Sequence, residues 1–189
     1  KIPVPIKVGT SVDYMWGKST NQVSVIETDA RIPMKHALSQ FVVRLKVSPE
    51  YHNDGNLTSA KLKATASKFA TTGTMNLNDG GKITFQPTST ELTWSPNTTV
   101  PAQGQQAVDY AAAIYPMTLA AGEVSLEVVI DGATYTYAIP QITWEAGKRY
   151  IYSITMRSND AEIGGENGQS VTIEGWTSTE EDITLVPVK

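Results

Sequence analysis

Two alternating runs joined by an Asp-Gly dipeptide constrain the fold of this chain most strongly. In residues 123–130 (EVSLEVVI) and 133–139 (ATYTYAI), apolar and polar side chains alternate with the period of a β-strand. Asp131-Gly132 between them favours a type I′ turn, because that turn needs a positive φ at both central residues. A two-residue turn also fixes the register, and here it places the apolar side chains of both strands on one face. The predicted pairs are Ile130 with Ala133, Val128 with Tyr135, Leu126 with Tyr137, and Val124 with Ile139.

A third alternating run, residues 149–157, follows shortly after the hairpin. The Glu-Ala-Gly sequence at residues 145–147 is short enough for a hairpin loop, with its glycine in the left-handed position. The stretch 123–157 is therefore predicted to form three antiparallel strands in succession. The residues on one face of the third strand are Tyr150, Tyr152, Ile154 and Met156.

The rest of the chain offers further short strands and no convincing helix. Residues 40–47 alternate an apolar face with a charged face, as a half-buried strand does. Residues 107–119 are rich in alanine, but Pro116 would cost about 3 kcal/mol inside a helix, so a strand ending near Pro116 is predicted. Polar loops are predicted at residues 95–106 and 158–169. The other strand candidates are residues 23–26, 59–66, 82–85, 92–94 and 171–176.

About eight to ten short strands separated by turns predict an all-β fold, an antiparallel two-sheet β-sandwich. The length of 189 residues fits one large domain or one and a half small ones. The absence of cysteine excludes disulfides, thiolate metal sites and thiol nucleophiles. The net charge of -4, without any basic block, argues against nucleic acid and anionic membranes as partners.

No motif of a catalytic or cofactor site occurs in the sequence, so neither an enzyme nor a cofactor is predicted. Of the two histidines, His36 beside an apolar strand is interpreted as structural and His52 as a solvated turn residue. Residues 158–169 contain carboxylates and amides from which a calcium site could be built, but their order matches no EF-hand loop. The acidic run at residues 180–182 is interpreted as a solvated turn.

The aromatic side chains leave two interpretations open. Tryptophans and tyrosines can stack on sugar rings, or they can fill the core and the faces of the sheets. Alternation with polar residues in adjacent strands favours the second interpretation for the tyrosines of the central stretch. The four tryptophans are Trp16, Trp94, Trp144 and Trp176.

Both ends of the sequence are short, alternating segments that contain proline. Such a segment can complete the sheet of a neighbouring subunit, with backbone hydrogen bonds giving affinity and alternate side chains filling pockets. It can equally pair as an edge strand within its own sandwich, where proline limits aggregation. The candidate exchanged or edge-strand residues are Ile2, Val4, Ile6 and Val8 at one end, and Ile183 and Leu185 at the other.

Several segments, in order along the chain, resemble one family. Five segments carry the resemblance. They are residues 13–18 (DYMWGK), residues 31–47 (RIPMKHALSQFVVRLKV), a strand, proline turn and hairpin at 113–141, the run WEAGKRYIYSI at 144–154, and a closing strand ending in tryptophan at 171–176. They are similar to segments of the fimbrillin-like (Mfa-like) proteins of Bacteroides-type bacteria. Each segment is weakly specific alone, and together they are fairly specific.

The resemblance implies a transthyretin-like sandwich that is exported as a lipoprotein to the outer membrane and the cell surface. It implies a non-enzymatic structural or adhesive subunit of a fimbria, joined to other fimbrial subunits by strand exchange, with a host protein or a glycan as a further partner. Residues 1–30 would then be an extended segment, either edge strands or the remnant of a preceding sandwich, and residues 31–189 the β-sandwich domain. The alternative function is a surface glycan-binding lipoprotein module.

Overall fold

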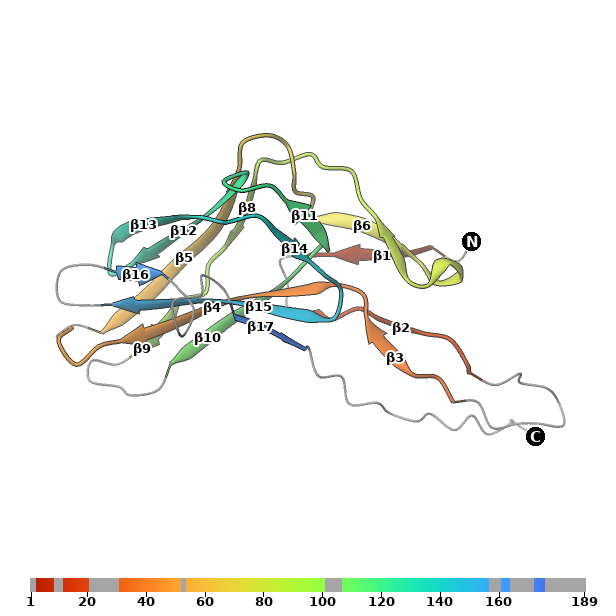
Figure 1. Ribbon diagram of the computed structural model, residues 1–189, viewed down its shortest axis with the longest axis horizontal. Coiled ribbons are helices and arrows are strands. Elements are labelled where there is room, and N and C mark those ends of the chain that lie inside the picture. The colour runs from red at the N-terminus through yellow and green to blue at the C-terminus, as the bar shows by residue number, and fades with distance from the viewer. Residues whose placement is uncertain are drawn as a thin grey trace, which may run out of the picture.

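A computed structural model describes residues 3–8, 12–20, 31–51, 54–100, 107–156, 161–163 and 172–175. These residues form seventeen β-strands and one short 3₁₀ helix, so the predicted all-β class is confirmed. Figure 1 shows a large β-sandwich at the left and a smaller group of strands at the right. The transthyretin-like topology remains a prediction that rests on the family resemblance.

The large sandwich consists of two five-stranded sheets. In both sheets every described pair is antiparallel except β4 with β15, which run parallel. The first sheet has the order β10 (Val108–Ile114), β4 (Ser39–Val47), β15 (Lys148–Met156) and β16 (Ala161–Ile163), with β17 (Thr172–Gly175) also on β15. The second has the order β13 (Ala133–Ala138), β12 (Val124–Ile130), β5 (Gly55–Ala64) and β8 (Glu91–Trp94), with β9 (Thr98–Val100) also on β5.

An aromatic cluster fills the space between these two sheets. The Phe41 ring on β4 lies 5.7 Å from the Trp94 ring on β8 and 4.7 Å from the Tyr152 ring on β15, measured between centroids. Trp144 Nε1 donates a hydrogen bond of 3.2 Å to the buried Tyr152 hydroxyl. Burying rings of this size supplies much of the hydrophobic stabilisation of a sandwich. The strand faces predicted from residues 40–47 and 149–157 both line this core.

The smaller group of strands surrounds a second, separate cluster. It contains a three-stranded sheet of β1 (Pro3–Lys7), β6 (Thr72–Asn76) and β7 (Lys82–Thr84), and the 3₁₀ helix η1 (Leu77–Asp79) lies between β6 and β7. It also contains the pair β2 (Met15–Gly17) and β3 (Met34–His36); β11 (Met117–Leu119) pairs with β14 (Ile142–Trp144) between the two groups. The buried residues of this second cluster are Ile6, Val8, Ala37, Leu38, Ala70, Met75, Ala113 and Tyr115.

The predicted hairpin is confirmed in its turn and in its register. Ile130 pairs with Ala133, Val128 with Tyr135 and Leu126 with Tyr137, and the Ile139 amide donates to the Val124 carbonyl oxygen. Asp131 has a φ of 50° and Gly132 a φ of 82°, the positive values that a type I′ turn needs. Tyr51 and Asn56 hold the Asp131 carboxylate by hydrogen bonds, which fixes this turn against the start of β5.

The prediction of three successive antiparallel strands at residues 123–157 is wrong for the third strand. β15 lies in the other sheet, parallel to β4, and the chain crosses between the sheets through β14. Ile151 and Val42 on the outer face of this pair are fully buried, so β15 is a central strand with both faces covered. Alternation shows which residues share a face, but it does not show which strand lies alongside.

Two predicted loops contain short strands. β9 lies inside residues 95–106 and β16 inside residues 158–169, which makes the strand count higher than predicted. β6 was not predicted, because its sequence TGTMN has no alternating apolar pattern. The alanine-rich segment is extended as predicted, and Pro116 separates β10 from β11. The strand candidate at residues 23–26 lies outside the described residues.

Candidate functional site

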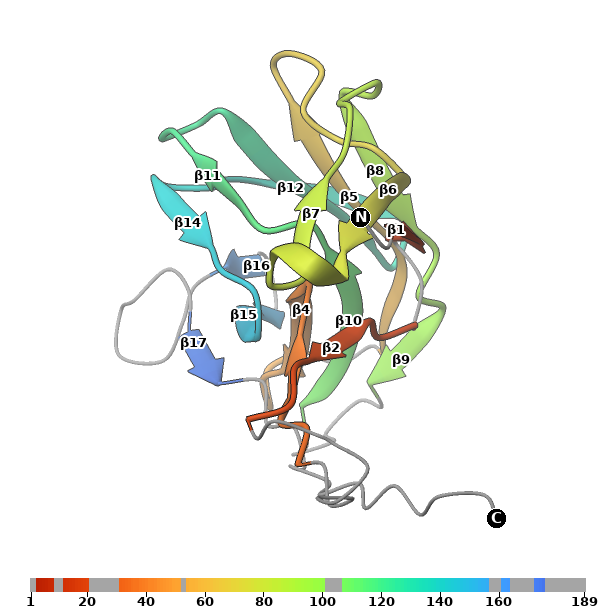
Figure 2. The same ribbon diagram turned by 90° about the vertical axis from the view of Figure 1, so that its right-hand side faces the viewer.

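β1 is an edge strand whose inward side chains fill the second cluster. It pairs antiparallel with β6, and Ile6 lies opposite Gly73. Ile6 is 1% exposed and Val8 5%, while Val4 is half-buried and also packs against the cluster. Pro5 and Lys7 point to solvent. The alternation predicted from the sequence therefore places one face of β1 on the second cluster, and the site that β1 occupies beside β6 (Figure 2) is called the groove below.

The outer edge of β1 cannot accept a further strand easily. The Val8 amide donates to the Thr71 carbonyl oxygen at 3.0 Å, so the alternate residues Ile6 and Val4 also direct their backbone groups toward β6. The residues between them face away, and at those positions Pro3 and Pro5 have no amide hydrogen to offer. The Lys7 amide, also on that side, donates to the Tyr14 hydroxyl at 3.1 Å.

An aromatic ring forms part of the floor of the groove. Gly73 lacks a side chain opposite Ile6, and a Cβ atom there would lie 2.7 Å from the Tyr115 hydroxyl oxygen. The Tyr115 ring stacks on Phe85 with 4.2 Å between centroids. Its hydroxyl is buried without a hydrogen-bond partner among the described residues, and burial raises the pKa of Tyr115 to about 12. The groove is thus shaped for apolar side chains and carries one unsatisfied polar group.

The structure describes only part of the predicted strand-exchange set. Val4 and Ile6 lie in β1 and Val8 directly after it, whereas Ile2, Ile183 and Leu185 lie outside the described residues. Sequence reasoning missed a link between the two ends. Residues 4–7 read Val-Pro-Ile-Lys and residues 186–189 read Val-Pro-Val-Lys, so the pattern that docks on β6 occurs twice. A direct comparison of the two terminal segments would have revealed it.

A pocket of about 610 Å³ opens beside this groove, between the β2–β3 hairpin and the turn after η1. Its described lining includes Lys35 and Lys82 and no acidic residue. His36 is 8% exposed in its wall, and its Nδ1 atom lies 2.8 Å from Asp13 Oδ2. Trp16 also lines the pocket, but its ring packs against Gly81, with the Lys35 Nζ atom 5.8 Å from its centroid.

The other candidates from the sequence lie in the core or outside the described residues. Trp94 and Trp144 are 3% and 1% exposed, so neither offers a ring face to a sugar. Trp176, His52 and the acidic run at residues 180–182 lie outside the described residues, as does most of the calcium candidate at residues 158–169. Within the described part of the chain, no group of three or more acidic or histidine side chains is arranged to hold a metal.

No helix among the described residues is long and apolar enough to span a bilayer.

Comparison with solved structures finds the same fold in larger bacterial proteins. A protein proposed to act in cell adhesion from Bacteroides ovatus matches with a TM-score of 0.53 and 18% identity over 90% of this chain and 62% of its own. A second such protein, from Bacteroides uniformis, matches with a TM-score of 0.54 and 16% identity over 90% of this chain and 68% of its own. The chain thus spans about two thirds of the length of these relatives. No curated protein matches the chain.

The comparison with family models covers nearly the whole described structure. One model, described as fimbrillin-like, matches residues 4–176, from β1 through the end of β17. The matched range includes both clusters and the groove beside β6, which agrees with the order of segments in the sequence. The chain belongs to the fimbrillin-like family.

Proposed function

We propose that the chain is a non-enzymatic structural or adhesive subunit of a surface fimbria, and that subunits join by strand exchange at the position of β1. The family supports the fimbrial part of this proposal. The arrangement of β1 carries the second part, because the strand pairs with β6 alone among the described strands and plugs a groove with alternate side chains. Those are the features of a strand that a partner's strand can replace.

The repeated Val-Pro-(Ile/Val)-Lys pattern supports a donor within the same chain. Placed on β6 in the register of β1, residues 186–189 would put Val186 at the position of Val4 and Val188 at that of Ile6. Pro187 would replace Pro5, where the groove requires no amide hydrogen. We therefore propose that residues 186–189 of one subunit occupy the β1 groove of the next, with Val186 and Val188 as the inward side chains and Leu185 at the outward position of Pro3.

A peptide-binding experiment tests this assignment. A variant that lacks residues 1–8 and 183–189 has an empty groove and no internal donor, and its main core contains none of the removed residues. We expect it to bind a synthetic peptide of residues 183–189 and a peptide of residues 1–8, with mutual competition. A matched peptide carrying Val188→Asp should not bind, because it would bury an unpaired carboxylate. A folded variant that binds neither peptide would contradict strand exchange at this site.

A second candidate function is glycan binding at the pocket beside the groove. The observation that favours it is a lining with two lysines and no carboxylate, which suits an acidic sugar. Binding of uronic or sialic acid glycans that is lost in both Lys35→Ala and Lys82→Ala, and kept in the surface variant Lys46→Ala, would support it. A glycan array without acidic hits would exclude it in favour of the assembly role alone.

A further inference from the structure

The edges of the described sheets differ in how they are protected against pairing with another chain. The β1 edge is closed by prolines and by Tyr14, as described above. On β10 the Asp109 carboxylate contacts Arg44 and Arg149, at 2.7 Å and 3.6 Å. On β8 the Glu91 carboxylate lies 3.4 Å from Lys61 Nζ. Prolines and charged side chains on edge strands are the usual protection against edge-to-edge association.

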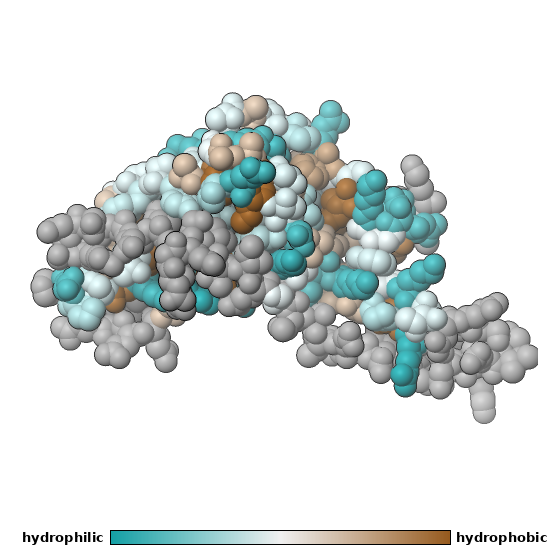
Figure 3. Space-filling model, viewed as in Figure 1, coloured by the Kyte–Doolittle hydropathy of each residue, from teal (hydrophilic) through white to brown (hydrophobic). Residues whose placement is uncertain are grey.

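β13 has neither kind of protection. Its sequence, ATYTYA, contains no charged residue and no proline, and it pairs only with β12 among the described strands. Ala133, Thr134, Thr136 and Ala138 are all exposed. The corresponding region at the upper left of Figure 3 is pale, in keeping with these nearly neutral side chains. Six uncharged residues, of which the two threonines and two tyrosines have high β-propensity, are thus available at one side of the second sheet.

The turn determines which backbone groups of β13 face outward. Ile139 donates its amide hydrogen to the Val124 carbonyl oxygen at 2.9 Å, so odd-numbered residues direct their backbone groups toward β12. Thr134, Thr136 and Ala138 therefore direct their amide and carbonyl groups away from the sheet. No interstrand hydrogen bond within the described sheet uses these groups.

We propose that β13 pairs antiparallel with β13 of a second copy of this chain, about a two-fold axis at Thr136. In this register Thr134 lies opposite Ala138 of the second copy, and Tyr135 lies opposite Tyr137 of the second copy. The outward backbone groups of Thr134, Thr136 and Ala138 can then all form hydrogen bonds with the same three residues of the second copy. The sequence around Thr136 is nearly the same in both directions, so similar side chains lie opposite one another. Tyrosine pairs across the axis add contact area, as aromatic cross-strand pairs do in sheets.

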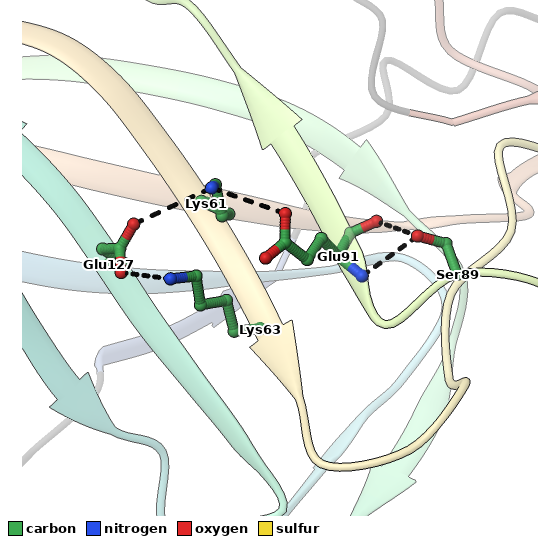
Figure 4. Close-up of polar contacts among 5 residues, drawn as sticks. All are labelled: Lys61, Lys63, Ser89, Glu91 and Glu127. Atoms are coloured by element: carbon green, nitrogen blue, oxygen red, sulfur yellow. Dashed lines mark hydrogen bonds and ion pairs between the residues drawn. The ribbon is translucent and has the colours of Figure 1, made fainter.

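Charge is also compatible with this pairing. Extending the register places Asp131 opposite Gln141 of the second copy, so no like charges meet. On the neighbouring strand, Glu127 lies opposite Thr136, but its carboxylate contacts Lys63 Nζ at 2.6 Å and Lys61 Nζ at 3.9 Å (Figure 4). The charged row of Glu91, Lys61, Glu127 and Lys63 carries two positive and two negative side chains, so Glu127 brings no unbalanced charge next to the axis.

One shared strand edge makes a small interface, below about 1,200 Å² in total. We therefore expect a reversible dimer at micromolar concentrations rather than a permanent one. The pairing joins chains side by side and leaves β1 and its groove free, so it is separate from strand exchange. Pairing through β13 would therefore make a lateral contact between subunits, whereas the proposed strand exchange at β1 would join them end to end.

Sedimentation equilibrium of the full chain over a concentration series tests the proposal with a charge exchange at the axis. We expect the unsubstituted chain to dimerise, and Thr136→Lys and Thr136→Glu each to weaken the dimer at least tenfold, because like charges meet at the axis. An equimolar mixture of the two variants should recover association. The matched control Thr93→Lys, an exposed threonine on the opposite edge strand β8, should dimerise as the unsubstituted chain does.

A chain that stays monomeric throughout the series would overturn the proposal. So would dimerisation that Thr136→Lys leaves unchanged, or a mixture of the two charged variants that remains monomeric. Because none of these variants alters β1, β6 or the terminal segments, failure here would leave strand exchange at the groove unaffected. Melting temperatures of the variants close to that of the unsubstituted chain would show that the fold is intact.

Discussion

β1 and β13 are both edge strands, but they are held in opposite ways. β1 belongs to the small sheet, packs on the second cluster, and has an outer edge closed by Pro3, Pro5 and Tyr14. β13 is tied to β12 by a two-residue turn, packs on the main core through Tyr135 and Tyr137, and has an open outer edge. We therefore propose that β1 can be replaced by another strand but not extended, and that β13 can be extended by another strand but not replaced.

This difference follows from where each strand places its hydrophobic contacts. The main cluster contains Leu126, Val128 and their neighbours from both large sheets, so β12 and β13 cannot leave without opening the whole sandwich. The second cluster has eight buried residues, of which β1 and the residue after it supply Ile6 and Val8. A strand that contributes to a small cluster can separate locally at a fraction of the global cost.

The largest effect is expected when a buried charge is placed in the cluster that each strand packs on, because the two substitutions should have different outcomes. Leu126→Asp puts an unpaired carboxylate in the main core and should cost more than about 4 kcal/mol, which leaves no cooperative fold. Ile6→Asp should release β1 while the main sandwich stays folded. Near-ultraviolet circular dichroism of the Trp94 and Trp144 cluster would show this, with the signal lost in the first variant and kept in the second. Loss of the signal in both would mean that the two clusters unfold as one unit.

A smaller effect concerns the buried tyrosines under each strand, Tyr115 in the β1 groove and Tyr152 beneath Tyr137. Tyr115→Phe removes an unpaired hydroxyl and should raise the free energy of unfolding by up to about 1 kcal/mol. Tyr152→Phe loses the hydrogen bond from Trp144 and should lower it by about 1 kcal/mol. Urea unfolding measures whether the free energy of unfolding rises or falls in each variant. A decrease in both variants would show that the Tyr115 hydroxyl has a hydrogen-bond partner.

Tyr115 also predicts how stability changes at alkaline pH. The pKa of Tyr115 is raised to about 12 in the folded chain, whereas the pKa of an unfolded tyrosine is about 10. The unfolded state therefore loses its proton first, and the free energy of unfolding falls as pH rises from about 10 to about 12. Below pH 10 this contribution is fully present. Tyr115→Phe should make the decline shallower by about 1–2 kcal/mol in urea titrations at pH 9 and 11.5; an unchanged decline would contradict the buried position.

The smallest effect tests the closed edge of β1. Pro5→Thr provides an outward amide hydrogen and should change stability by less than about 0.5 kcal/mol, because no ladder hydrogen bond involves Pro5. It should, however, increase concentration-dependent association at this edge. Light scattering of this variant beside Pro101→Thr, outside any described strand, gives the comparison. Equal scattering from both would show that proline does not protect β1.

The sequence predicts the local features of this fold better than the distant ones. The β12–β13 hairpin was predictable because turn chemistry and alternation act within one short segment and agree on one register. The neighbours of β15 were not predictable, because β4 lies more than 100 residues earlier and the alternation of a strand does not indicate which other strand pairs with it. β6 was not predicted because Gly73 acquires its role only through Tyr115, which lies between β10 and β11 and is distant from Gly73 in the sequence.

The same limit applies to the candidate site. Alternation in residues 1–8 predicted which side chains of β1 face inward, but it could not show that β6 forms the groove. Closure of the outer edge depends on Tyr14, whose hydroxyl meets the Lys7 amide only in the folded chain. The open edge of β13 likewise became visible only when its position at the end of a sheet was known.

Native-state hydrogen exchange at low denaturant concentrations tests the central difference between the two strands most directly. The amides of Ile6 and Val8 should exchange through local opening, with a free energy well below that of global unfolding and with little dependence on denaturant. The amides of Leu126 and Val128 should exchange only by global unfolding. If all four amides share one free energy and one denaturant dependence, β1 is an integral part of the sandwich, and it cannot be the strand that a partner replaces.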